Sequence, residues 1–544
     1  MPKWIQMRLK FVCLLLLLFG AKVHYSQKVI NKQRPNILWL VTEDISPYLS
    51  FYGDSTAKTP NLDRLAKEGV VYTNAFSTAG VCAPSRSAII TGMYATSIGT
   101  DNMRTSAGVP LKNITSYSAV VPLYVKMFTE YMRKSGYYCT NNAKQDYQFK
   151  APLSGWDESS KKAHWRNRKP GQPFFAVFNF DVTHESQVWE RKNEPLLVNP
   201  TDVKLPPYYP ESPVIRKDMA RMYSNIMVMD GQVGKLLNQL KEDGLLDKTI
   251  IFFYSDNGGP LPRGKREIYE SGIHLPMVIR FPNKVNAGKR DSRLVSYVDL
   301  APTVLSLAGV KIPEYIQGIA FEGSQKGTER KYVYAARDRM DTAYDIVRTV
   351  RDRKFQYLKN FQPEKPYMQD ITYRLDMDLM KELLRFNKEH RLNAIQNLWF
   401  RKTKPVEELY DIEADPYNLN NLAQDKKYAG KLEELRNELS SWMNLTNDKG
   451  FIPEEELVKQ MWGYKDAPPG TASPCYRVEV DMVSLECLTE GASISWQWID
   501  EGASPKKNEW NVYNGPIQIQ KGKELVAIAE RIGYNSSEVV TKNF

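Results

Sequence analysis

Cysteine and histidine are both scarce in this chain of 544 residues, which contains five of each. So few cysteines, one of them inside an N-terminal apolar run, exclude a disulfide framework. Cys475 and Cys487 either pair within one small domain or remain as two buried thiols. The chain also lacks internal repeats, low-complexity tracts and nucleic-acid-binding motifs. Its net charge of +11 suits acidic partners in general, without indicating nucleic acid.

Long apolar runs are missing except at residues 11–20. That run follows Lys3, Arg8 and Lys10 and is too short to cross a bilayer, which is typical of the core of a signal peptide. We therefore expect a signal peptide over residues 1–26 and a mature protein without a membrane span. The expected location is the periplasm or the outside of the cell, or the lysosome in a eukaryote.

The first half of the chain alternates between strand and helix patterns. Nearly continuous apolar runs predict strands that are covered on both faces. These runs occupy residues 36–42, 174–180, 249–254 and 275–281. Apolar residues at helical spacing predict helices over 60–69 and 217–243. Such alternation predicts an α/β sandwich around a mostly parallel sheet.

The second half changes character. Residues 331–361 predict paired strands, and helical spacing predicts helices over 375–395 and 424–443. Alternating apolar residues beyond a linker predict a small all-β module, with strand segments at 478–482, 494–498, 517–519 and 526–528. We therefore divide the chain after the signal peptide into a main domain over 27–330, a smaller α+β subdomain over 331–462 and an accessory β-sandwich-like module over 463–544.

Two acidic pairs directly follow predicted strands, Glu43-Asp44 after the first and Asp256-Asn257 after the third. The carboxyl ends of parallel strands meet at one edge of a sheet, where α/β proteins place their sites. Alone, the first pair is typical of a helix cap and the Asp-Asn-Gly-Gly segment of a turn. Together, three carboxylates and an amide oxygen are hard ligands that suit Ca²⁺ or Mg²⁺ better than zinc. The pattern therefore predicts a shared metal site.

Two further clusters lie near the same predicted edge. Thr183 and His184 follow the strand over 174–180, and the segment Cys-Ala-Pro-Ser-Arg at 82–86 leads into a helical stretch. A lone cysteine there would most often be an inert buried thiol. However, this segment, with Thr-Gly at 91–92, resembles the Cys-x-Pro-Ser-Arg signature of the type I sulfatases.

The resemblance to type I sulfatases covers roughly residues 34–445. Further matching stretches are Pro-Asn-Ile at 35–37, Thr-Pro-Asn-Leu-Asp at 59–63, Ser-Asp-Asn-Gly at 255–258, Tyr-Glu-Ser-Gly-Ile at 269–273 and Leu-Tyr-Asp at 409–411. The resemblance implies an alkaline-phosphatase-like sandwich and hydrolysis of sulfate esters or sulfamates. A phosphoryl-transfer enzyme of the same fold is disfavoured, because it would need a Ser or Thr nucleophile and usually several zinc-binding histidines.

In this family the signature cysteine, here Cys82, is oxidised to formylglycine (3-oxoalanine) by a formylglycine-generating enzyme. One hydroxyl of the hydrated aldehyde attacks sulfur and the other helps expel sulfate, so that one difficult step becomes two. The resemblance also implies a calcium ion that polarises a sulfate oxygen. By the family pattern its ligands are Glu43, Asp44, Asp256, Asn257 and the residue made from Cys82.

The other catalytic roles that the resemblance implies belong to three cations and one histidine. Arg86 would hold the aldehyde hydrate, and Lys144 and Lys265 would contact the sulfate, where they neutralise developing negative charge. His184 would act beside them or protonate the leaving group.

This chain departs from the family pattern at two places. The family usually has Asp-Asp where this chain has Glu43 and Asp44. Its Gly-Lys-x-His segment reads Ala-Lys-Gln-Asp at 143–146, so that either Asp146 replaces the histidine or the segment is displaced. A non-catalytic glycan-binding relative is therefore an alternative to an active enzyme.

The substrate prediction depends on shorter stretches. Residues 42–47 and 337–341 are similar to the heparan N-sulfatase (sulfamidase) branch of the family. That branch removes the N-sulfate of glucosamine in heparan or heparin; an O-sulfatase acting on another sulfated glycan is the alternative. Four side chains could hold a sulfated oligosaccharide or equally serve as framework salt-bridge partners, namely Asn102, Arg104, Arg337 and Arg339.

Overall fold

The computed structural model describes residues 34–103, 114 and 116–544, of which residues 35–544 form one unit by their contacts. The predicted signal peptide therefore lies outside the described residues, as does Arg104. Within the described part of the chain, no helix is both long enough and apolar enough to span a bilayer.

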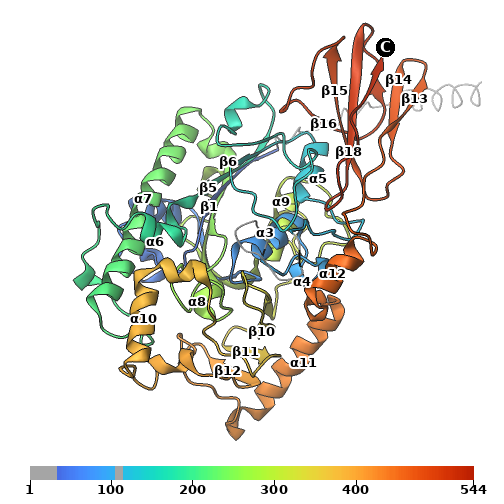
Figure 1. The fold of residues 1–544 in the computed structure, drawn as a ribbon. Helices are drawn as coiled ribbons and strands as arrows, with labels where there is room; N and C mark the ends of the chain where they lie inside the picture. Colours follow the sequence, from blue (N-terminus) through green and yellow to red (C-terminus); the bar gives the residue numbers. More distant parts are fainter. Residues whose placement is uncertain (1–33, 104–113, 115) are drawn as a thin grey trace, which may run out of the picture. The chain divides into compact units, whose positions relative to one another are not determined.

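An eight-stranded sheet with the strand order β4-β3-β5-β1-β6-β7-β2-β8 forms the centre of this unit (Figure 1). Within this sheet only β7 runs against its neighbours; the other pairings are parallel. The predicted mostly parallel sheet is confirmed. Its strands are β1 (Asn36–Thr42), β2 (Val70–Phe76), β3 (Tyr138–Asn142), β4 (Glu158–Ser159), β5 (Phe174–Phe180), β6 (Thr249–Ser255), β7 (His274–Arg280) and β8 (Arg290–Ser296).

Helices cover both faces of the sheet (Figure 1). The side chains of β1 alternate between these faces, as expected for a strand. Leu38 and Leu40 pack in one core with α7 (Pro213–Glu242), and Trp39 packs in another with α5 (Phe128–Lys134). The remaining helices of this region are α2 (Pro60–Glu68), α3 (Cys82–Thr91), α4 (Ala95–Ile98), α6 (Ser186–Glu190), α8 (Glu270–Ile273) and α9 (Leu300–Leu307).

A second, antiparallel sheet follows in the chain and confirms the paired strands predicted at 331–361. Its order is β12-β11-β10-β9, and the unpredicted strand β12 pairs with β11. Trp442 of helix α11 stacks on Tyr334 of this sheet with 5.0 Å between ring centroids. The elements are β9 (Val333–Arg337), β10 (Val347–Arg351), β11 (Phe355–Asn360), α10 (Asp378–Lys388), β12 (Glu407–Asp411), α11 (Ala429–Leu445) and α12 (Glu454–Met461).

The predicted all-β module forms two antiparallel sheets, β13-β14-β17 and β16-β15-β18-β19. The prediction of a single strand over 478–482 is wrong, because Val480 has a φ of 52° and lies in the turn between β13 and β14. Cys475 and Cys487 are both free, which contradicts the expected pairing; Cys475 is exposed and Cys487 is half-buried, so the alternative of two buried thiols is wrong as well. The strands are β13 (Cys475–Glu479), β14 (Met482–Glu486), β15 (Ser493–Asp500), β16 (Asn511–Val512), β17 (Ile517–Gln518), β18 (Lys523–Glu530) and β19 (Val540–Asn543).

Helix α5 and the residues just before it form one of the contacts between this module and the rest of the unit. Ser493 donates a hydrogen bond to the carboxylate of Glu130, which is 1% exposed. Lys126 Nζ donates to Ser493 Oγ at 2.9 Å, and Arg133 donates to the backbone carbonyl of Trp510. The domain boundaries themselves remain predictions.

Candidate active site

The carboxyl ends of β1 and β6 bring the two predicted acidic pairs together. The backbone nitrogen of Asp44 lies 3.3 Å from Asp256 Oδ1, and Asn257 Nδ2 donates to Asp44 Oδ1 at 2.8 Å. All four side chains are buried. Because burial disfavours the charged form, the pKa of Glu43 rises to about 7, although Lys144 beside it opposes the shift. Three buried carboxylates so close together need positive charge nearby.

Cys82 is the first residue of helix α3, and every residue of that helix is buried. Ser85 Oγ donates to the backbone carbonyl of Asp256, so the first turn of α3 is anchored to the end of β6. Ligand atoms of Cys82, Glu43 and His184 all lie within 4.8 Å of one another. Burial raises the pKa of the Cys82 thiol. The partial positive charge of the helix N-terminus favours an anion at this position.

Three cations lie among the buried acids, and all of them were predicted as catalytic residues. Burial opposes the charge of Lys144 and Lys265, yet the neighbouring carboxylates outweigh it and the pKa values of both lysines are raised. The site therefore keeps its positive charges at neutral pH, ready to bind an anion. The closest ion pairs are Arg86 Nε to Asp256 Oδ2 at 2.8 Å, Lys144 Nζ to Glu43 Oε2 at 2.6 Å and Lys265 Nζ to Asp44 Oδ2 at 2.6 Å.

His184 lies at the same site, at the end of a short 3₁₀ helix that follows β5. Its Nδ1 accepts a hydrogen bond from the backbone N–H of Ser186 at 3.3 Å, which assigns the proton of the neutral ring to Nε2. That Nε2 lies 4.0 Å from Glu43 Oε2. Burial, together with Lys265, lowers the pKa of His184 to about 4, so the imidazole is neutral at pH 7.

Asp146, at the place of the family histidine, also belongs to this cluster. Its Oδ2 lies 3.3 Å from Lys144 Nζ. Asp146 thus pairs with Lys144, and His184 is the histidine of this cluster within the described residues.

The acidic pairs fit a hard divalent cation. Asn257 Oδ1 is buried and finds no hydrogen-bond partner within the described part of the chain. A buried polar atom of this kind is costly unless a further group satisfies it. Carboxylate and amide oxygens are the ligands that calcium prefers. The residues at the ends of β1 and β6 are thus compatible with the calcium site that the sequence resemblance implies.

Three residues of the cluster were not predicted. Asn179 on β5 accepts a hydrogen bond from Arg86 at 2.8 Å. Glu185 lies 3.2 Å from Lys265 Nζ, and both terminal nitrogens of Arg266 donate to it at 2.7 Å. The sequence contains a feature that could have indicated each of these three residues. Asn179 is the one polar residue in an otherwise apolar strand, and the other two directly follow predicted catalytic residues.

The described side chains that were predicted to contact carbohydrate are engaged in buried contacts. Arg337 pairs with Glu267, and Arg339 pairs with Glu454. Asn102 Oδ1 accepts a hydrogen bond from the backbone of Arg339 at 3.1 Å. These contacts favour the framework role that was the alternative, and substrate contact at these positions stays a prediction.

Tyr373 lies next to His184, and Trp189 packs against Tyr373. Tyr373 is 40% exposed, and its ring centroid lies 6.3 Å from the imidazole of His184 and 5.1 Å from the indole of Trp189. Exposed rings beside a site can pack against the apolar face of a sugar. No sequence pattern links positions 189 and 373, so only the fold reveals this pair.

Gly272 allows the loop that carries Lys265 to fold tightly. A Cβ atom at this position would lie 2.0 Å from the carbonyl oxygen of Glu267 and 2.6 Å from that of Gly264. We expect Gly272→Ala to lower the free energy of unfolding by about 1–3 kcal/mol, the usual cost of overpacking. Thermal unfolding measures the change. Gly231→Ala is the matched control, since a Cβ there meets nothing within 4 Å; equal losses in both variants would contradict the prediction.

Two family profiles match this chain. The sulfatase profile matches residues 35–310, and a profile described as N-sulphoglucosamine sulphohydrolase, C-terminal, matches residues 263–371. An ulvan-active sulfatase of Formosa agariphila is 47% identical over 543 residues, which cover 93% of this chain and 91% of the relative. N-sulphoglucosamine sulphohydrolase of Homo sapiens is 24% identical over 499 residues, which cover 82% and 96%.

Solved structures share the architecture. BT4656 in complex with its substrate D-glucosamine-2-N,6-O-disulfate matches with a TM-score of 0.56 and 20% identity, over 78% of this chain and 100% of that one. The phosphonate monoester hydrolase SpPMH of Silicibacter pomeroyi matches with a TM-score of 0.57 and 16% identity, over 77% and 97%. These likenesses concern the fold, and they confirm the predicted alkaline-phosphatase-like sandwich. With its profile match and its 47% identical relative, the chain belongs to the sulfatase family and is a sulfatase.

Proposed function

We propose that this sulfatase removes sulfate from its glycan by nucleophilic attack from residue 82. The observation that carries the proposal is the meeting of Cys82, Glu43 and His184 within 4.8 Å, with Lys144 and Lys265 beside them. A sulfate group at this position would be surrounded by positive charge that the buried carboxylates hold in place.

The proposal includes two groups that the family implies. Formylglycine, made from Cys82 by a formylglycine-generating enzyme, supplies a hydrated aldehyde as nucleophile. A calcium ion, when bound, supplies polarisation of a sulfate oxygen. The residues that would hold the ion are Glu43, Asp44, Asp256, Asn257 and the residue derived from Cys82.

The chain's own side chains then divide the work of binding and proton transfer. Lys144 and Lys265 remain protonated at neutral pH and bind the sulfate oxygens. Arg86, fixed between Asp256 and Asn179, orients residue 82. His184 carries its proton on Nε2, which faces the cluster, and this N–H can be donated to the leaving oxygen or nitrogen.

The identity of the glycan is supported by two unequal similarities. The 47% identical relative is named an ulvan-active sulfatase, which favours ulvan as the substrate. The sequence prediction of N-sulfated glucosamine in heparan is supported by the C-terminal profile match over residues 263–371 and by a relative of 24% identity. We place ulvan first and keep heparan N-sulfate as the second candidate.

A substrate panel tests this order. Ulvan oligosaccharides and N-sulfated heparin disaccharides are incubated with the protein, and free sulfate is measured by ion chromatography. We expect sulfate from ulvan and none from the N-sulfate group. Release from the N-sulfate alone would reverse the order, and release from neither would contradict both candidates.

Maturation of the protein is tested separately. Mass spectrometry of the tryptic peptide that spans Cys82 reports whether the thiol has become an aldehyde, and the N-terminal sequence of the exported protein reports cleavage of the signal peptide proposed for residues 1–26. We expect a formylglycine peptide from active preparations. A fully active preparation in which residue 82 is an unmodified thiol would contradict the mechanism.

A further inference from the structure

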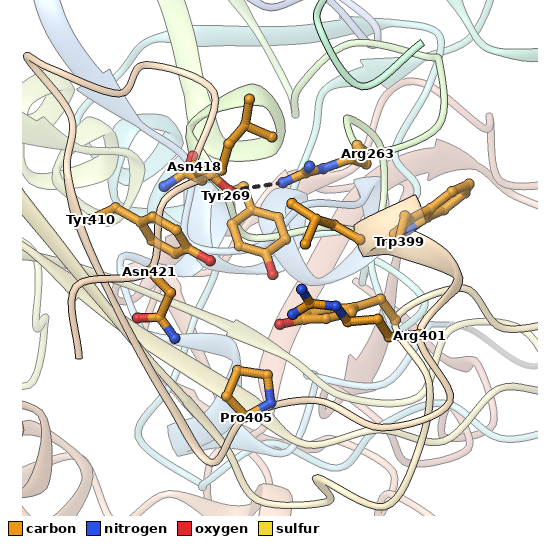
Figure 2. A pocket seen from close by; sticks show the side chains of 11 residues that line it. Arg263, Tyr269, Trp399, Arg401, Pro405, Tyr410, Asn418 and Asn421 are labelled. Carbon is orange, nitrogen blue, oxygen red and sulfur yellow. Dashed lines mark hydrogen bonds between the residues drawn. The ribbon is translucent and has the colours of Figure 1, made fainter. Parts of the chain in front are cut away.

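A pocket with a cavity volume of about 50 Å³ is lined by side chains from five chain segments, and none of the predicted catalytic or metal-binding residues belongs to it (Figure 2). Arg263 and Tyr269 come from the loop after β6, and Tyr410 comes from β12. Trp399 belongs to a 3₁₀ helix before β12, and Arg401 follows it. In Figure 2, Tyr410 lies on one side of the opening and Trp399 and Arg401 on the other.

Most polar groups of this pocket are already engaged. The hydroxyls of Tyr269 and Tyr410 both donate to the buried carboxylate of Glu408. Asn418 Nδ2 donates to the Gln356 side chain at 2.9 Å, and Asn418 Oδ1 accepts from a backbone N–H. These groups therefore shape the floor of the pocket and have little capacity left for a ligand.

The groups that remain free are all hydrogen-bond donors. Arg263 Nε and Trp399 Nε1 are buried and lack a partner among the described residues, and each of these side chains is 5% exposed. Arg401 is exposed and forms no hydrogen bond or ion pair with any residue that the structure describes. Two guanidinium groups and an indole N–H call for an acceptor-rich, negatively charged ligand.

Arg263 further supports an anionic ligand for this pocket, because it is a buried cation without a carboxylate partner. Its side-chain hydrogen bonds within the described residues go to the backbone carbonyls of Tyr417 and Asn418. Its guanidinium lies 4.8 Å from the ring centroid of Tyr208 and 5.0 Å from that of Tyr269. A buried charge normally has an ionic partner, and here a bound anion would supply it.

We propose that this pocket is a second glycan-binding site, which holds an anionic sugar unit away from the site of hydrolysis. The sulfate or carboxylate of the sugar binds Arg263 and Arg401 and accepts the indole N–H of Trp399. The sugar ring packs on the surrounding aromatic side chains. That the anion belongs to a sugar rests on the proposed function, whereas the preference for an anion rests on the pocket alone.

The indole N–H of Trp399 gives a direct readout of the pocket. The full chain has 11 tryptophans, so indole-¹⁵N labelling yields few resonances, and Trp399→Phe assigns the one of interest. The titrations use Cys82→Ala to prevent turnover and compare glucose 6-sulfate, glucuronate, glucose and inorganic sulfate. We expect the Trp399 resonance to shift with glucose 6-sulfate or glucuronate, at lower concentration than with inorganic sulfate, and not with glucose.

Variants of neighbouring cations complete the test. Arg401→Ala should raise the midpoint of the titration about tenfold, as expected for loss of a charge-assisted hydrogen bond. Lys402→Ala removes an adjacent exposed charge that does not line the pocket and should leave the midpoint unchanged. An unmoved Trp399 resonance, or equal midpoints for inorganic sulfate and the anionic sugars, would overturn the proposal. Sulfate release measured on the unsubstituted protein judges the proposed function independently.

Discussion

Replacing Cys82 with alanine is expected to lower kcat for sulfate release by about 10⁴-fold or more, which is the usual effect of removing a catalytic nucleophile. Cys82 begins a fully buried helix whose first turn is tied to the end of β6, so the substitution removes the reacting group while the surrounding cations keep their partners. The measurement is free sulfate released from the best glycan of the substrate panel.

Cys139→Ala is the matched control for this experiment. Cys139 is also a fully buried thiol, but it lies on β3 with its Sγ near the carbonyl of Thr129, outside the acidic cluster. We expect this variant to keep kcat within a few-fold of the unsubstituted protein. Sulfate release by Cys82→Ala at a rate comparable to that control would rule out the nucleophile assigned here.

Lys265→Met is expected to be costly for both stability and catalysis. Lys265 Nζ lies 2.6 Å from Asp44 Oδ2 and 3.2 Å from Glu185 Oε1, and all three side chains are buried. Removing one partner leaves uncompensated buried charge, so the free energy of unfolding should fall by about 3 kcal/mol or more. Loss of a cation at the sulfate should lower kcat by about 10²–10³-fold.

Urea unfolding and sulfate release measure the two effects of Lys265→Met separately. Lys169→Met is the control, because Lys169 is exposed and forms no ion pair with any of the described residues. The control should change neither quantity. If Lys265→Met unfolded at the same urea concentration as the control and released sulfate equally fast, Lys265 would have neither the structural nor the catalytic role.

The strands and the two acidic pairs could be predicted because their signals are local. Strand β1 is apolar on both faces, and Glu43 and Asp44 follow it directly, so a parallel sheet brings them to the edge where β6 also ends. The signature at 82–86 added the nucleophile and the family. These inferences need only the order of residues along the chain.

The residues that escaped prediction depend on contacts between distant segments. Arg337 and Arg339 were left open between substrate contact and a framework salt bridge, and only the fold shows their acidic partners, Glu267 and Glu454. The alternation around Val480 imitated one strand, because a hairpin with a tight turn preserves the spacing of apolar residues on either side. Partners distant along the chain decide the case of the two arginines, whereas the turn at Val480 is local but leaves no mark in the alternation of apolar residues.

The hydrogen bond from Ser493 to Glu130 means that the terminal module cannot be treated as a removable tail. A chain shortened at residue 462 would leave Glu130 with Ser154 as its remaining side-chain donor and would uncover one flank of α5, which packs on β3. The loop after β3 carries Lys144. A deletion that loosens α5 and β3 is therefore expected to displace this lysine of the candidate active site. Expression designs that trim this protein to its family core should therefore retain the last 80 or so residues.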